Sequence, residues 1–209
     1  MRITEFEYES QGAGFGGLLA EPSDRAIAGS VPVVINLAAG RHETMAEEPF
    51  NWPARLFTAE GYRAVTVDLP HRGERVPSWK EAGLSGMAEA WAAGVDSFSQ
   101  FVRDGRALID TLIQRRWADP ARVYLHGTSR GGYYAARLAA ADSRIAGLAM
   151  VAPVTEWRTL VEFNPVKHRD DVAALTLDHY ANTLAGRPVY ATIPNRDNRV
   201  ATGSCLHYY

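Results

Sequence analysis

The stretch that decides the fold is Tyr124–Tyr133, which reads YLHGTSRGGY. An apolar strand pattern ends at His126, and a helix of small residues follows Ser129. Residues 127–131 read GTSRG, a G-x-S-x-G pentapeptide that is a weak signal alone and a strong one between a strand and a helix. Glycines allow such a turn to pass close to its neighbours. The sequence therefore predicts an exposed nucleophilic serine on a sharp turn; the alternative is a glycine-rich turn with an incidental serine.

Strand and helix patterns alternate on both sides of this turn. Near-continuous apolar runs, typical of strands buried on both faces, lie at Val31–Leu37, Arg63–Asp68, Arg122–His126, Ile145–Val151 and Pro188–Ile193. Helical spacing of apolar residues occurs at Phe50–Glu60, Phe101–Trp117, Gly132–Ala141 and, more weakly, Asp171–Leu184. This alternation predicts an α/β fold with a mostly parallel sheet and helices on both faces.

Two further segments depart from the alternating pattern. Ile3–Tyr8 and Phe15–Ala20 are rich in β-forming residues and are separated by glycines, which predicts an antiparallel N-terminal hairpin. The stretch Glu74–Asp96 is the longest irregular one and contains several glycines. We expect it either to cover a site as a lid or to be a surface excursion.

Composition limits the classes of protein that need to be considered. The chain has 209 residues, 46% apolar and 22% charged, which predicts a single domain over residues 1–209. A net charge of −2 gives no reason to expect nucleic acid or an anionic membrane as partner. The lone Cys205, an N-terminus unlike a secretory signal and the lack of a long apolar stretch predict a soluble, cytoplasmic protein.

The sequence predicts no cofactor and no metal. The loop after the first parallel strand lacks the glycine fingerprint of dinucleotide-binding enzymes. The densest patch of possible metal ligands, residues 42–48, is better explained as the start of a solvated helix.

The chain resembles the α/β-hydrolase superfamily, in particular its prolyl-oligopeptidase-like and dienelactone-hydrolase-like esterase and peptidase branches. The G-x-S-x-G-G turn carries the resemblance, and Gly61–Arg75 is similar to the family's next strand and turn. Pro32–Arg41 is similar to the strand and loop that supply an oxyanion amide, with two alanines where His-Gly is usual, so the resemblance implies Gly40 as donor. The N–H of Arg130, at the start of a helix, is the other expected oxyanion donor.

A candidate acid lies in the last predicted strand and its loop. Arg187–Val200 resembles the family's G-x-x-D-x-x-V loop, with Pro194 in place of the glycine and Asp197 at the position of the acid. A carboxylate at the carboxyl end of a parallel strand lies on the same rim as Ser129. The alternative for Asp197 is a solvated turn residue.

The histidine that should follow the acid in chain order is missing at the expected position. Only NRVATGSCLHYY follows Asp197, too short for the further helix and strand that precede the family's histidine. We expect His207 to lie on the helix that begins this unit, and the chain to be C-terminally incomplete. The other options are that His207, or His71 or His42 from a rim loop, acts as base.

Two functions follow from this pattern. The first is a serine hydrolase that cleaves a carboxylic ester, thioester or peptide bond through an acyl-enzyme on Ser129, with a small-molecule ester or a peptide as substrate. The second is a catalytically inactive hydrolase fold that keeps its cleft as a binding module. The sequence leaves the identity of the substrate and the oligomeric state open.

Overall fold

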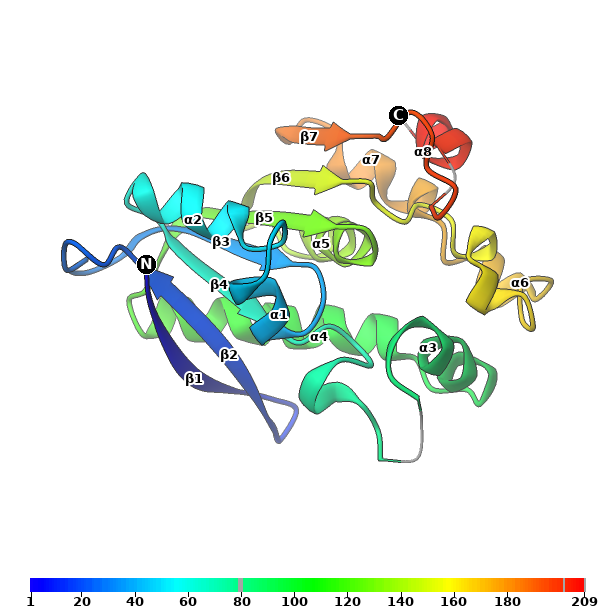
Figure 1. The fold of residues 1–209 in the computed structure, drawn as a ribbon, viewed down its shortest axis with the longest axis horizontal. Helices are drawn as coiled ribbons and strands as arrows, with labels where there is room; N and C mark the ends of the chain where they lie inside the picture. The colour runs from blue at the N-terminus through cyan, green and yellow to red at the C-terminus, as the bar shows by residue number, and fades with distance from the viewer. Residues whose placement is uncertain (79–80, 201, 209) are drawn as a thin grey trace.

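The computed structural model describes residues 1–78, 81–200 and 202–208. Its centre is a seven-stranded sheet with the order β1-β2-β4-β3-β5-β6-β7 (Figure 1). The strands are β1 (Arg2–Ser10), β2 (Ala13–Glu21), β3 (Val31–Leu37), β4 (Arg63–Val67), β5 (Ala118–Thr128), β6 (Ile145–Val151) and β7 (Val189–Thr192). Each predicted strand is present, and the boundaries of β3 and β6 coincide with the predicted ones.

The direction of the strands confirms the predicted α/β-hydrolase-type fold. β1 and β2 form the expected antiparallel hairpin, and β2 joins the sheet by antiparallel pairing with β4. The pairs β3–β4, β3–β5, β5–β6 and β6–β7 are all parallel. The carboxyl ends of these parallel strands therefore meet at one rim, where ligands bind in open α/β sheets.

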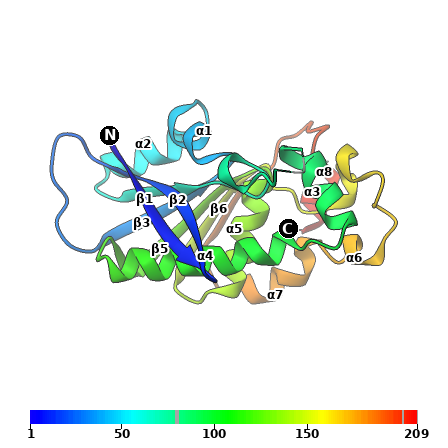
Figure 2. The same cartoon turned by 90° about the horizontal axis from the view of Figure 1, so that it is seen from below.

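Helices cover both faces of the sheet, with α1 and α2 on one face and α4, α5 and α7 on the other (Figure 2). The helices are α1 (Arg41–Ala46), α2 (Trp52–Ala59), α3 (Gly83–Ala92), α4 (Ser97–Gln114), α5 (Arg130–Ala141), α6 (Asp170–Ala173), α7 (Ala181–Leu184) and α8 (Thr202–Tyr208). The expected helices at α2, α4 and α5 are confirmed. The weak pattern at Asp171–Leu184 corresponds to the short helices α6 and α7 with a 3₁₀ turn between them rather than to one helix. No helix in the described part of the chain is long and apolar enough to cross a membrane.

The stretch Glu74–Asp96 is more regular than the sequence suggests. It contains the ten-residue helix α3, which begins at Gly83 and lies beyond the carboxyl ends of the strands (Figure 1). α4 then begins at Ser97, four residues before the predicted start, because the carboxylate of Asp96 accepts a hydrogen bond from the Ser99 N–H at 2.9 Å and caps the helix.

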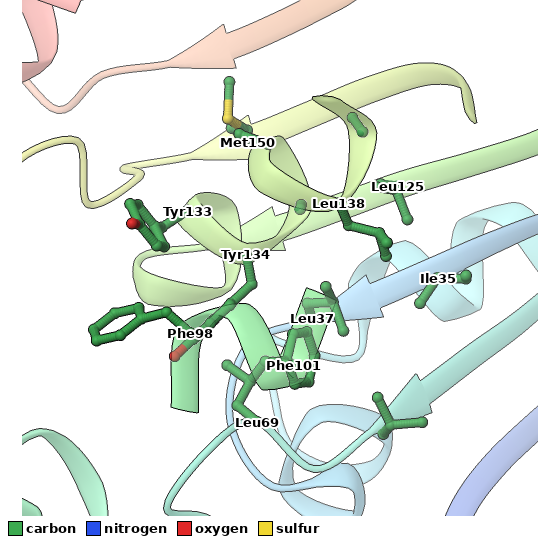
Figure 3. Close-up of a cluster of buried hydrophobic side chains, with 14 of the residues drawn as sticks. Ile35, Leu37, Leu69, Phe98, Phe101, Leu125, Tyr133, Tyr134, Leu138 and Met150 are labelled. Carbon is green, nitrogen blue, oxygen red and sulfur yellow. The ribbon is translucent and has the colours of Figure 1, made fainter. Parts of the chain in front are cut away.

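The main core lies between the sheet and the helices α4 and α5. Close aromatic packing fills it: the ring centroids of Phe98 and Trp157 are 4.8 Å apart, and those of Phe101 and Tyr134 are 4.7 Å apart. Figure 3 shows Tyr133 and Tyr134 of α5 above Phe98 and Phe101 of α4. Because α5 starts directly after Ser129, this packing also fixes the base of the predicted turn.

The opposite face of the sheet carries a groove of about 450 Å³ between α2 and the strands β5, β6 and β7. Phe57, Tyr62, Tyr124 and Tyr190 line it together with His126. Nδ1 of His126 lies 2.8 Å from Oδ1 of Asn36, whose Nδ2 donates to the Phe50 carbonyl. Since this amide oxygen can only accept, Nδ1 carries the proton in the neutral ring.

Burial lowers the pKa of His126 to about 4, so the ring is neutral in the fold and charges in the unfolded chain near pH 6.5. Between these pH values the folded state binds fewer protons, and stability falls as the pH drops. As the pH falls through this window, the titration of His126 should lower the free energy of unfolding by at most about 3 kcal/mol. Solvent screening makes the effect smaller than this limit.

Urea unfolding at pH 7, 5.5 and 4.5 measures this effect in the wild-type protein and in His126→Gln, which cannot titrate. The stability difference between the two proteins should shrink or reverse as the pH falls. A difference that stays constant with pH would contradict the assignment.

Candidate active site

The predicted strand-to-helix turn is present between β5 and α5. Ser129 has φ 55° and ψ −122°, a backbone conformation that costs a non-glycine residue free energy. The surrounding backbone holds it there, because the Ser129 N–H donates to the Val151 carbonyl at 2.9 Å and the Val154 N–H donates to the Ser129 carbonyl at 3.0 Å. The serine is thus clamped against the end of β6, and its side chain is half-buried at the rim of the sheet.

Three glycines make the turn possible. A Cβ on Gly127 would lie 2.3 Å from the Gly131 carbonyl oxygen, and one on Gly131 would lie 1.9 Å from the Leu37 carbonyl oxygen. At Gly132 it would lie 2.9 Å from the Pro153 Cβ. The motif glycines are therefore required by contacts with the start of α5, with β3 and with the segment after β6, in agreement with the sequence-based reason for them.

The structure brings the two predicted oxyanion donors to the same rim as Ser129. Arg130 is the first residue of α5, so its N–H has no acceptor in the preceding turn of the helix. Gly40 is the N-cap residue of α1, in the loop after β3, while the neighbouring Ala39 N–H donates to Thr44 Oγ1 at 3.0 Å. The close contact between Gly131 and Leu37 places this loop against the start of α5.

Asp197 lies in the loop after β7, two strands further along the same rim. Its Oδ1 accepts hydrogen bonds from the N–H groups of Arg199 at 2.7 Å and Val200 at 3.0 Å. The guanidinium of Arg199 pairs through both amino groups with the carboxylate of Glu162. One carboxylate oxygen thus stabilises the loop, while Oδ2 is not engaged by these two N–H groups. The loop is also tied by Thr202 Oγ1, which accepts from the Asp197 N–H at 3.0 Å.

The histidines considered as bases lie in different surroundings. His71 is buried at the rim after β4, and its Nδ1 is 3.4 Å from the Glu81 carbonyl oxygen. His42 is exposed, with Nε2 3.8 Å from a carboxylate oxygen of Glu5. His207 lies on α8, as expected, and its side chain is outside the described part. In the described residues, no imidazole is bonded to the Asp197 carboxylate.

Asp68 organises the rim beside Gly40 in a way that the sequence only hinted at. Its carboxylate accepts from the Arg41 N–H at 2.6 Å, from the Arg41 guanidinium at 2.5 Å and from the Glu74 N–H at 3.1 Å. A Cβ on Gly73 would lie 2.4 Å from this carboxylate, which explains the glycine. The loops after β3 and β4 are thereby held together. Asp68 and Gly73 both lie in the stretch Gly61–Arg75, whose similarity to the family's strand and turn was the sequence signal for this region.

The sequence did not predict that α3 packs against the turn. The buried Met87 of α3 places its sulfur 3.7 Å from a guanidinium nitrogen of Arg130. Residues 83–92 therefore pack directly against the residue that follows Ser129.

Comparison with known proteins identifies the family of this chain. Residues 55–201 match the family model described as serine aminopeptidase, S33, which covers the turn, α5 and the Asp197 loop. The chain belongs to this family. It is an α/β-hydrolase, as the resemblance implied, and hence by family a serine hydrolase.

Solved structures share the fold at low sequence identity. An acetyl xylan esterase from Paenibacillus sp. R4 superimposes with a TM-score of 0.69 at 20% identity, covering 99% of this chain and 73% of that chain. A cold-adapted esterase from an Arctic intertidal metagenomic library gives 0.71 at 20%, covering 99% and 77%. The acylaminoacyl peptidase of Pyrococcus horikoshii gives 0.72 at 14%, covering 100% of this chain but 34% of its own. A search of curated protein sequences finds no match.

The contact between Gly131 and Leu37 yields a test of the turn. Gly131→Ala should lower the free energy of unfolding by about 3 kcal/mol or more, since the added methyl group would meet a backbone carbonyl that has no room to move. Urea denaturation measures this difference. Gly14→Ala is the matched control, because a Cβ there meets no atom within 4 Å. Equal effects of the two substitutions would refute the packing argument.

Proposed function

We propose that the protein cleaves carboxylic esters by transferring the acyl group to Ser129. The observation that carries this proposal is the strained backbone of Ser129, held at the rim by glycines that tolerate no side chain. Such strain persists only where the surrounding structure enforces it, and it is concentrated at functional sites. In a member of a serine hydrolase family, this supports Ser129 as the nucleophile.

The reaction follows from the groups around the turn. Ser129 Oγ attacks the carbonyl carbon and transfers its proton to a base, while the N–H groups of Arg130 and Gly40 donate to the developing oxyanion. The C–O bond then breaks, and the alcohol leaves with a proton. Water attacks the acyl-enzyme in the same manner and releases the acid.

Asp197 would orient the base. Its Oδ1 is taken by two backbone N–H groups, so Oδ2 is the oxygen suited to accept from the N–H of an imidazole. A carboxylate in this role fixes the tautomer of the histidine and stabilises its positive charge during proton transfer.

Esters are favoured over peptides by the coverage of the related structures. The chain spans about three quarters of the two esterases but about a third of the acylaminoacyl peptidase. Small-molecule esters are therefore the proposed substrates, with thioesters and peptides as further acyl donors for the same chemistry.

The second candidate function is a binding module without turnover. It is favoured by the surroundings of Asp197, whose described hydrogen bonds are to backbone N–H groups rather than to an imidazole. The two functions differ in whether Ser129 is reactive.

Reactivity of Ser129 is tested with p-nitrophenyl acetate and with a fluorophosphonate probe. We expect a burst of p-nitrophenol and covalent labelling, both abolished in Ser129→Ala, because the hydroxyl is the only group of that residue able to accept an acyl or phosphonyl group. Ser30→Ala, at an exposed position before β3, is the control. Labelling and turnover that are equal in wild type and Ser129→Ala would refute the role; no labelling of either would also refute it and would favour the binding module.

Asp197→Asn tests the acid. The amide oxygen can still accept from Arg199 and Val200, so the loop and the unfolding midpoint should be kept. The rate of p-nitrophenyl acetate cleavage should fall by about 10⁴-fold, because an amide cannot stabilise the required imidazolium. A fall of less than tenfold with the fold intact would remove Asp197 from the mechanism.

A further inference from the structure

The guanidinium of Arg130 is buried without a counter-ion. The residue is 5% exposed, and its Nη1 lies 3.7 Å from the uncharged sulfur of Met87. No carboxylate in the described part of the chain pairs with it. A thioether is a weak acceptor, and burying a charge in this way is costly. Burial lowers the pKa of Arg130 to about 10, so the group is still charged at neutral pH.

Two other buried arginines in this fold have acid partners. The buried Arg63 donates to Glu21 at 2.7 Å and to the carbonyls of Gly29 and Ile27. The largely buried Arg75 donates to Asp104 at 2.6 Å. Arg130 differs from these two in having no acid partner. The half-buried Arg137 also lacks one in the described residues, but its guanidinium donates to Ser99 Oγ and lies over the rings of Tyr133 and Tyr180.

A second cation lies nearby at the rim. The Cβ of Arg72 is 4.0 Å from the position of a Cβ on Gly40, next to the proposed oxyanion loop. Its Nε is buried without a hydrogen-bond partner, and its Nη1 is 3.7 Å from Glu43, longer than a hydrogen bond. Its charge also contributes to the lowered pKa of Arg130. Two guanidinium groups therefore flank the serine turn, and one of them is buried. Arg72 has only the long ion pair with Glu43, and Arg130 feels the charges of Glu43 and Glu162 without an ion pair to either in the described residues.

We infer that the ester cleaved at Ser129 carries a carboxylate, which pairs with the guanidinium groups of Arg130 and Arg72. The inference rests on the proposed function and names its substrate class. A carboxylate supplies the acceptors that both groups lack, and arginine is suited to it because its planar fork matches the two oxygens. The carboxylate takes no part in bond making: Oγ bonds to the ester carbonyl carbon, the C–O bond breaks, and the charged group stays on its own fragment.

Matched ester pairs test this class. The first pair is the glutarate hemiester of p-nitrophenol, whose charge is on the acyl side, and the neutral p-nitrophenyl butyrate. The second pair is 4-acetoxybenzoate, whose charge is on the leaving group, and the neutral phenyl acetate. In one pair, kcat/KM should be about ten- to hundredfold higher for the anionic ester, the range expected of a charge-assisted hydrogen bond. The preference should disappear in Arg130→Met, fall in Arg72→Gln and partly survive in Arg130→Lys.

A measurement without turnover separates this inference from the proposed function. Glutarate, at matched ionic strength against chloride, should raise the unfolding temperature of the wild type and of Ser129→Ala alike, and should not do so in Arg130→Met. This result supports the carboxylate site even if fluorophosphonate labelling shows Ser129 to be unreactive.

Arg122→Met is the control for loss of a positive charge, since Arg122 is exposed and pairs with Asp119 at the opposite end of β5. It should leave the anionic preference and the glutarate effect unchanged. The inference is overturned if neither ester pair shows a preference and glutarate does not stabilise the wild type. It is also overturned if both effects persist in Arg130→Met.

Discussion

The contact between the Leu37 carbonyl and the α-carbon of Gly131 is the constraint on which the rest of the rim depends. A backbone carbonyl at the end of β3 lies against the first turn of α5 so closely that only hydrogen fits between them. This approach fixes α5 relative to the sheet and forces Ser129 into its strained conformation. It also sets the loop after β3 beside the start of the helix, so the amides of Gly40 and Arg130 belong to one small region.

Electrostatic interactions around this contact divide into two kinds. The carboxylates of Asp68 and Glu162 are saturated by arginines and backbone N–H groups, and they hold the loops after β3, β4 and β7 in place. Arg130, by contrast, is buried against the sulfur of Met87 and forms no ion pair within the described residues. Loops are thus stabilised by complete ion pairs, whereas the position next to the serine retains an unbalanced charge. An unbalanced charge stabilises no fold, which is why it indicates a ligand.

The sequence predicts this fold well where a periodic pattern reflects burial. Val31–Leu37 and Ile145–Val151 are almost entirely apolar because the central strands are covered on both faces. The glycines of the turn likewise indicate close packing around Ser129. Helix α3 was not predicted because its residues, GLSGMAEAWA, include two glycines and few large apolar side chains. The sequence predicted one helix where the structure has the two short helices α6 and α7, because a few spaced leucines resemble the pattern of a single helix.

Some residues of the candidate site could be predicted from the sequence and others could not. Ser129 and Asp197 are predictable because each follows a strand, and parallel strands end at one rim. Burial of the Arg130 guanidinium under Met87 depends on two residues 43 positions apart in the chain, and no local pattern encodes it. The roles of Ser129, Arg130, Gly40 and Asp197 in catalysis stay predictions until the substitutions are measured.

The two edges of the described sheet differ in a way that affects how copies of the protein meet. β1 carries Glu5, Glu7 and Glu9 on its exposed positions, so a second molecule approaching that edge brings like charges together. β7 has the uncharged sequence VYAT, with Val189 and Tyr190 exposed, and it pairs on one side only in the described structure. Strand addition is therefore repelled at one edge and unopposed at the other, which gives any self-association of this sheet a fixed direction.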